Sequence, residues 1–152
     1  MMPVFLKAIL AICLLVEIVS TTPLRQPEQI DDIKFKRYVA ILNASLDRAC
    51  KRLNNSSCGN AEIRKIRFEP NTEKICQTYK NVFLDVHCAL DKVAKSNPTE
   101  CNKTVSEIQP HPELFDNQTS CTLPNDDDML MKEFCLKLQK YVSRLYANCA
   151  NS

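Results

Sequence analysis

Apolar residues recur at helical spacing near the end of the chain, between Asp127 and Cys149, with charged and polar side chains on the opposite side. The apolar stripe consists of Leu130, Phe134, Leu138, Tyr141, Val142, Leu145 and Cys149. Asn125 is a candidate N-cap, and the carboxylates of Asp126–Asp128 would lie where a helix dipole favours negative charge. The pattern therefore predicts an amphipathic helix of about six turns.

Two earlier segments show the same one-sided pattern. The first runs from Ile30 to Leu53, and its apolar face consists of Phe35, Tyr38, Ile41, Leu42, Leu46, Ala49 and Leu53. The second starts at Asn71 or Thr72 and continues to about Lys95, with a stripe of Ile75, Tyr79, Val82, Phe83, Val86, Leu90 and Val93. Both segments are predicted to be helices that bury one face.

Shorter elements lie between these helices. Residues 61–68 are compatible with a brief strand or a short helix that ends before Pro70. The sequence Asn97-Pro98-Thr99-Glu100 is a helix start signal, and Cys101, Val105 and Ile108 then form a thin apolar seam. Residues 113–124 are predicted to be a loop. The chain is thus expected to form three long helices and one short helix.

One-sided helices must cover each other, so the expected fold is all-α, a short-chain four-helix bundle. The long connections follow the first and third helices, which favours up-up-down-down winding with overhand loops. A single glycine, Gly59, argues against a β-rich domain with many tight turns. One domain over residues 21–152 is predicted.

Residues 1–20 have the pattern of a secretory signal: one lysine, a short apolar run and then small polar residues. Cleavage is expected after Ser20 or Thr21, because Pro23 disfavours a cut directly before it. No later stretch is apolar enough to span a bilayer. The mature protein is therefore expected to be secreted into the extracellular space, as a monomer without membrane insertion.

Cysteine content agrees with secretion. Eight cysteines remain after residue 20, namely Cys50, Cys58, Cys76, Cys88, Cys101, Cys121, Cys135 and Cys149, and they are expected to form up to four disulfides. Helix geometry excludes a bond between Cys135 and Cys149, and between Cys76 and Cys88. The predicted winding brings the end of the first helix near the start of the last, which makes Cys50–Cys135 a reasonable pair. The other pairings stay open.

Five sequons also predict an exported glycoprotein, at Asn43, Asn54, Asn55, Asn102 and Asn117. The Asn54 and Asn55 sequons overlap, so both are not expected to be occupied. An occupied Asn43 would screen part of the first helix from any partner.

The sequence gives little support to nucleic-acid, metal or lipid binding. The net charge of +2 is unclustered, which disfavours nucleic-acid binding. No Cys-x-x-Cys pair supports a zinc site, and consecutive aspartates lack the spacing of a calcium loop, so no metal or cofactor is expected. A saposin-like lipid binder would need broader apolar faces than these helices have.

An enzyme is not expected, because no nucleophile–base pair is visible. The strongest catalytic alternative is a small secreted ribonuclease, because residues 50–54 resemble the start of a pancreatic-type ribonuclease signature. The next residues depart from that signature, and His87 and His111 both lie mid-chain. The two histidines are expected to be structural.

The last segment, LQKYVSRLYANCANS, with Tyr146 three residues before Cys149, resembles the end of cytokines of the interleukin-4/interleukin-13 group. Asn71-Thr72-Glu73-Lys74 followed by Cys76, the Cys76/Cys88 spacing, and Cys58 before a strand-like stretch resemble the same group. A rival resemblance is to interleukin-7 and thymic stromal lymphopoietin, through residues 36–38 and 45–47.

The resemblance implies a secreted immune cytokine that binds two type I cytokine receptor chains and signals through kinases and STAT proteins. In that group the first and third helices contact one chain, and the first and last helices contact the other. The receptor-binding residues implied here, or chosen for expected exposure on the first helix, are Tyr146, Arg144, Arg37, Asp47, Arg48 and Lys51. The resemblance also implies the pairs Cys58–Cys88 and Cys76–Cys101, which would leave Cys121 for Cys149.

Overall fold

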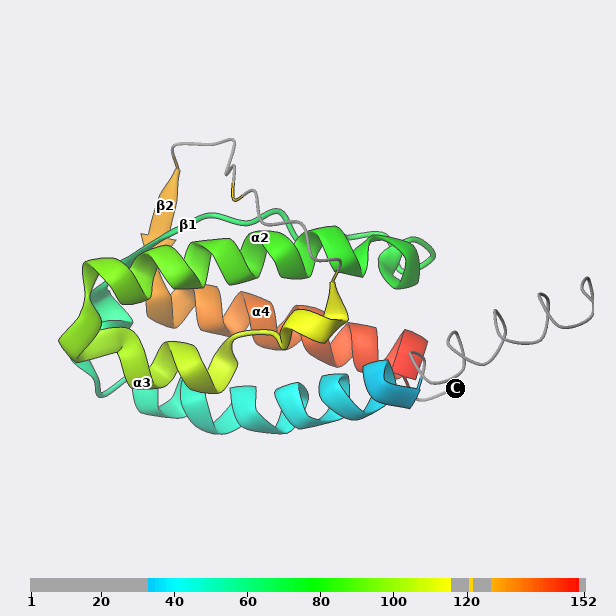
Figure 1. The fold of residues 1–152 in the computed structure, drawn as a ribbon, viewed down its shortest axis with the longest axis horizontal. Helices are drawn as coiled ribbons and strands as arrows, with labels where there is room; N and C mark the ends of the chain where they lie inside the picture. Colours follow the sequence, from blue (N-terminus) through cyan, green and yellow to red (C-terminus); the bar gives the residue numbers. More distant parts are fainter. Residues whose placement is uncertain (1–32, 116–120, 122–126, 151–152) are drawn as a thin grey trace, which may run out of the picture. The chain divides into compact units, whose positions relative to one another are not determined.

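A computed structural model describes residues 33–115, 121 and 127–150 of the chain (Figure 1). The chain divides into Met1–Lys34 and Phe35–Ser152, and the fold described here is that of the second unit. The predicted signal segment, the start of the first helix at Ile30 and the Asn117 sequon lie outside the described residues.

Four helices and a small antiparallel sheet make up the fold. In chain order the elements are the first helix (residues 33–53), a 3-10 turn η1 (Ser57–Asn60), β1 (Glu62–Arg64), α2 (Ile75–Ser96), α3 (Pro98–Ile108), a 3-10 turn η2 (Pro112–Leu114), β2 (Asp128–Leu130), α4 (Met131–Leu145) and a π-helical turn η3 (Tyr146–Ala150). The mostly helical prediction is confirmed. Among the described helices, none is long and apolar enough to cross a membrane.

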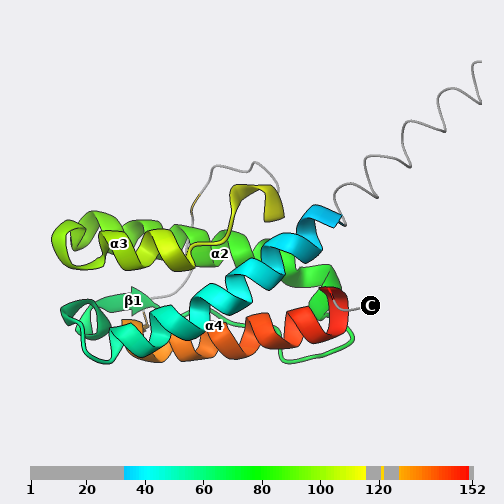
Figure 2. The same cartoon turned by 90° about the horizontal axis from the view of Figure 1, so that it is seen from below.

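Contacts between the helices define the winding. The first helix is antiparallel to α4, because Asn43 lies opposite Ser143 and Cys50 opposite Cys135. The α2 helix is also antiparallel to α4, since Cys76 is bonded to Cys149 and Phe83 packs on Tyr141. The first helix and α2 are therefore parallel, and α3 turns back from α2 (Figures 1 and 2). This is the predicted up-up-down-down order.

The two overhand connections meet in a short β-ribbon. β1 pairs antiparallel with β2, with Ile63 opposite Met129 and Arg64 opposite Asp128. The amide of Met131 donates to the carbonyl of Ala61 at 2.9 Å, which continues the pairing into α4. Of the two readings of residues 61–68, the strand is therefore correct.

The single glycine is required by close packing beside this ribbon. A Cβ on Gly59 would overlap the carbonyl oxygen of Leu53, where η1 folds against the end of the first helix. A side chain at this position would force the turn and the helix apart. Gly59 thus sets how closely the first overhand connection approaches the bundle.

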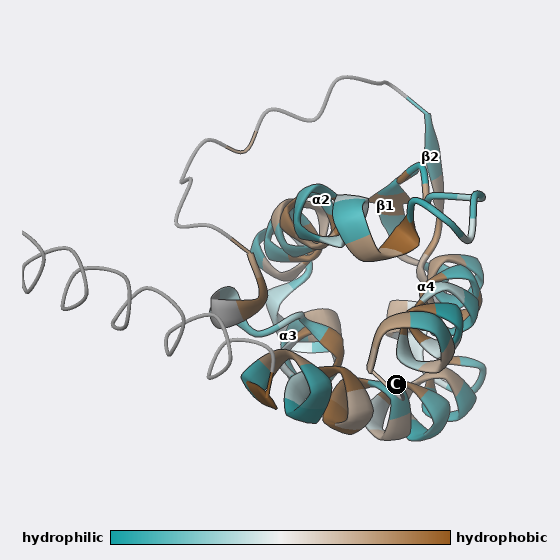
Figure 3. Cartoon of the chain, turned by 90° about the vertical axis from the view of Figure 1, so that its right-hand side faces the viewer, coloured by the Kyte–Doolittle hydropathy of each residue, from teal (hydrophilic) through white to brown (hydrophobic). Residues whose placement is uncertain are grey.

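The predicted apolar stripes form one core. Figure 3 shows the helices nearly end-on, arranged around a common centre. On α4, Phe134, Leu138 and Leu145 are fully buried, as the stripe predicts. The fully buried set also includes Met131 and Cys135. Burial of such side chains contributes about 1.5–3 kcal/mol each, and apolar burial is the main source of the bundle's stability.

The start of the last helix was predicted too early. α4 begins at Met131, and Asp128–Leu130 forms β2 instead of a first helical turn. Asp128 faces Arg64 across the ribbon, with a carboxylate oxygen 3.6 Å from the guanidinium. Its charge therefore pairs with Arg64 in the ribbon and does not lie in the first turn of a helix. Asn125 and Asp126 lie outside the described residues.

Three further predictions need correction. Ile41, expected on the buried face of the first helix, is 56% exposed, whereas Val39 is buried. α2 begins at Ile75, because the Asn71 side chain accepts from the amide of Glu73 and forms a separate turn before the helix. Asn97 donates to the carbonyl of Val93 and closes α2, and the structure shows no side-chain cap from it on α3.

All eight expected cysteines form disulfides, in the pairs Cys50–Cys135, Cys58–Cys101, Cys76–Cys149 and Cys88–Cys121. Cys50–Cys135 confirms the pair derived from the winding. The pairs Cys58–Cys88, Cys76–Cys101 and Cys121–Cys149, implied by the resemblance, are wrong. The η1 turn lies beside the start of α3, so Cys58 reaches Cys101. The η3 turn that follows α4 contacts α2, so Cys149 reaches Cys76.

Tyr141 supplies a prediction about the core. Its hydroxyl is buried without a hydrogen-bond partner among the described residues, and burial raises its pKa far above the usual range. Replacing Tyr141 with phenylalanine removes an unsatisfied polar group, so we expect unchanged or slightly higher stability, by up to about 1 kcal/mol. Urea unfolding at neutral pH measures this change.

The pH dependence gives the matched check on Tyr141. In the unfolded chain Tyr141 ionises at about pH 10, whereas in the folded protein it stays neutral. Tyr141 therefore lowers the free energy of unfolding progressively as the pH rises above that value, and has no such effect below it. The phenylalanine variant should lack this part of the alkaline loss. Identical alkaline curves for both proteins would show that the hydroxyl reaches water.

Candidate functional site

The outward side of the first helix carries an exposed stripe opposite the core. Arg37, Ile41, Ala44 and Arg48 recur at helical spacing and are all exposed. Among the described residues neither arginine has an ion-pair or hydrogen-bond partner. We call these four residues the outer surface. It combines one large apolar side chain with two unneutralised cations, one on each side of it along the helix.

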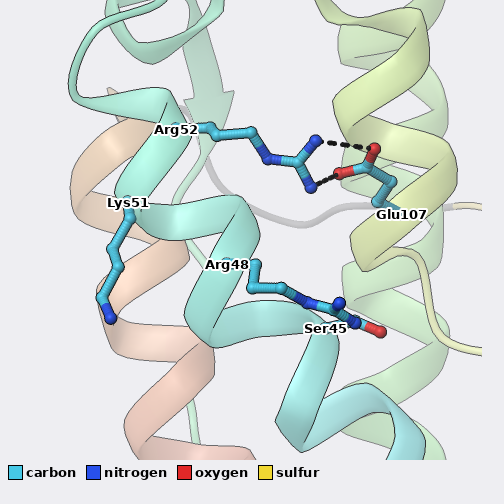
Figure 4. A pocket seen from close by; sticks show the side chains of 5 residues that line it. All are labelled: Ser45, Arg48, Lys51, Arg52 and Glu107. Carbon is cyan, nitrogen blue, oxygen red and sulfur yellow. Dashed lines mark hydrogen bonds and ion pairs between the residues drawn. The ribbon is translucent and has the colours of Figure 1, made fainter.

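Beside the outer surface, a shallow pocket of about 650 Å³ separates the first helix from α3. Arg52 crosses it and donates twice to the Glu107 carboxylate on α3, at 3.2 and 2.5 Å (Figure 4). Arg48 extends from the first helix on the same side as Arg52, whereas Lys51 extends on the other side (Figure 4). The pocket therefore has a fixed ion pair at one end and the Arg48 cation at its edge.

On its other side the first helix is joined to α4 by polar contacts. Gln139 donates to the Asp47 carboxylate at 3.2 Å, and Lys51 pairs with the same carboxylate at 3.3 Å. Further along, the Ser143 hydroxyl donates to Asn43 at 3.0 Å. Asp47 and Lys51 are thus exposed but mutually neutralised, unlike Arg48.

Past this polar seam, α4 presents a second exposed apolar side chain. Leu136 is 50% exposed, and Lys132 and Lys140 lie one turn to either side of it. We call Lys132, Leu136 and Lys140 the α4 surface. Ile41 and Leu136 are thus exposed apolar residues flanked by basic residues on neighbouring helices; the other large exposed apolar residue among the described residues is Ile33, at the start of the first helix.

The two candidate residues at the end of α4 are held by the protein itself. Arg144 is half-buried, and its guanidinium donates to the carbonyls of Glu69 at 3.0 Å and Pro70 at 2.9 Å. It thereby ties the overhand connection to α4. Tyr146 is half-buried in η3 and packs against the core, so only part of its ring is open to a partner.

The Arg144 contacts predict a stability effect. Replacing Arg144 with methionine removes two charge-assisted hydrogen bonds but keeps much of the apolar stem. We expect a loss of about 1–2 kcal/mol in the free energy of unfolding, discounted because the group is partly solvated. Lys140→Met on the same helix is the matched control and should change stability little. Equal effects of the two changes would contradict the structural role of Arg144.

The contacts of the two histidines involve the second overhand connection: His87 on α2 contacts it, and His111 belongs to it and contacts the first helix. The amide of Gln109 lies 2.9 Å from Nδ1 of His87, and His111 stacks on Tyr38 with ring centroids 4.4 Å apart. These contacts agree with the structural role expected for them. No cluster of three metal-binding side chains occurs among the described residues.

Sequence reasoning missed the two apolar residues of these surfaces. Ile41 was assigned to the core because it is apolar and lies next to Leu42, although its position is turned away from the buried stripe. Leu136 carried a usable signal, since it stands on the polar side of α4 between Lys132 and Lys140. An isolated large apolar residue on an otherwise charged helix face indicates an exposed apolar side chain.

Comparisons with protein-family models, curated proteins and solved structures found no match to this chain.

Proposed function

We propose that the domain is a secreted helical cytokine that binds two type I receptor ectodomains and triggers kinase/STAT signalling. The observation that carries the proposal is the up-up-down-down winding, with two overhand connections paired in a ribbon. This winding is the one found in growth hormone and cytokine bundles. The four disulfides are in keeping with an oxidising, extracellular setting.

The two exposed surfaces support a protein that acts by binding. Interfaces depend on a few large side chains that become fully desolvated, with charged residues around them that guide association. Ile41 and Leu136 are suited to be such anchors, and the neighbouring cations favour acidic partner loops. The outer surface and the α4 surface are proposed to contact one receptor chain each. Tyr146, at the end of α4, is a proposed peripheral contact.

Placing a negative charge on each surface tests this assignment. The secreted wild-type protein is screened on a biosensor against type I receptor ectodomains, together with Arg48→Glu and Leu136→Asp. Each variant should weaken a different ectodomain by about tenfold or more, because each places an unpaired negative charge in one interface. Lys92→Glu, on the exposed side of α2, is the control and should bind both ectodomains normally.

Two outcomes would contradict the proposal. If the folded protein binds none of the ectodomains, the cytokine assignment is wrong. If it binds, but both variants bind like wild type, the receptor-binding surfaces lie elsewhere.

A further inference from the structure

The Asn43 sequon lies in the polar seam between the first helix and α4. Its carbonyl oxygen Oδ1 accepts from the Ser143 hydroxyl at 3.0 Å. Its amide nitrogen Nδ2 has no partner among the described residues. An N-glycan is attached through Nδ2, so the contact with Ser143 and a glycan are compatible.

We infer that Asn43 carries an N-glycan that shields the α4 surface and thereby controls which receptor chain can bind. The inference rests on the proposed function for the receptor part, whereas the shielding follows from position alone. Ser143 and Lys140 lie three residues apart on α4, and Leu136 precedes Lys140 by four, so all three share one helix face. A glycan fixed opposite Ser143 projects from the edge of that face.

The chemistry of attachment is that of the secretory pathway. Nδ2 of Asn43 attacks the anomeric carbon of a lipid-pyrophosphate oligosaccharide held by a transferase. The new carbon–nitrogen bond forms, the carbon–oxygen bond to pyrophosphate breaks, and the amide proton passes to a base. Ser45 completes the recognised Asn-Ala-Ser triplet.

The Asn102 sequon lies on α3, away from the seam between the first helix and α4. Asn102 lies within about 20° of Gln109 around α3. Gln109 contacts His87 of α2, which indicates that a glycan on Asn102 would lie on the α2 side. It would not cover the seam with the first helix. Of these two sequons, Asn43 is the one beside a proposed receptor surface.

The experiment compares three full-length proteins secreted from a glycosylating host. Ser45→Ala removes the sequon but keeps Asn43, and Ser45→Thr changes the same side chain while keeping the sequon. Peptide mass mapping measures occupancy at Asn43. Lysine acetylation then measures the accessibility of Lys140, with Lys92 on α2 as the internal reference.

We expect Asn43 to be occupied in wild type and Ser45→Thr, with Lys140 acetylated more slowly there than in Ser45→Ala. Ser45→Ala should also bind the ectodomain sensitive to Leu136→Asp about tenfold more tightly than Ser45→Thr does. An unmodified Asn43 in the wild-type protein, or equal Lys140 acetylation in all three, would overturn the inference. Shielding of Lys140 without binding of any ectodomain would support the glycan's position and refute the proposed cytokine function.

Discussion

Replacing Phe134 with alanine is expected to destabilise the domain by about 3–5 kcal/mol, which is the usual cost of deleting a buried aromatic side chain. Phe134 is 0% exposed, and its ring centroid lies 6.0 Å from that of Phe68 in the first overhand connection. The cavity would therefore open between α4 and that connection. Urea unfolding with the disulfides intact measures the loss.

Leu136→Ala on the same helix is the matched control for Phe134→Ala. Because Leu136 is 50% exposed, its truncation should change the free energy of unfolding by no more than about 0.5 kcal/mol. The contrast separates a buried from an exposed apolar residue two positions apart. If both variants lost the same stability, the orientation of α4 described here would be wrong.

The second large effect is expected from the Cys50–Cys135 disulfide. Its loss in a Cys50→Ala/Cys135→Ala double variant releases a loop with a sequence separation of 85 residues. Chain entropy then favours the unfolded state by about 4.6 kcal/mol on the loop-length model. Both cysteines are also buried between the first helix and α4, so their truncation leaves a small cavity. Thermal and urea unfolding measure the combined loss.

A second pair of cysteines provides the comparison. Cys88–Cys121 spans only 33 residues, so Cys88→Ala/Cys121→Ala should cost less, by roughly 0.8 kcal/mol from loop length alone. The bond also links α2 to a connection and not to another helix. A larger loss from this pair than from Cys50–Cys135 would contradict the proposed order.

Helix periodicity made much of the fold predictable. The stripes on the first helix, α2 and α4 depend on local spacing, and the buried residues Leu46, Phe83 and Leu138 were all placed correctly. Pro98 at the first position of α3 was likewise a local signal. The winding followed from the lengths of the connections. The stripes and the helix start could be derived because they depend on neighbouring residues, and the winding because it depends on how far each connection can reach.

Features that depend on distant partners were harder to derive. Asp128 and Leu130 continue a helical pattern in the sequence, but pairing with β1 draws them into a strand. Propensity is a weak prior that tertiary contacts override. The predicted disulfide partners of Cys58 and Cys76 were wrong for a similar reason, because both pairs depend on how the connections and helix ends lie in space.

The candidate site was predicted only in part. Arg37, Asp47, Arg48 and Lys51 are exposed as expected. The sequence did not show that Asp47 pairs with Lys51, whereas Arg48 has no partner within the part of the chain that the structure describes. The contact of Arg144 with backbone carbonyls was also invisible, because it depends on the path of residues 69 and 70. A role in receptor binding remains a prediction for each of these residues.

A cytokine of the proposed kind binds two receptor ectodomains at the same time, and the mass of the complex shows whether this domain does so. Secreted protein without the Asn43 glycan is mixed with the two ectodomains that bind it best, and light scattering measures the mass of the eluted complex. We expect a complex with one copy of the domain and one copy of each ectodomain. Absence of any complex, or two ectodomains that exclude each other, would contradict it.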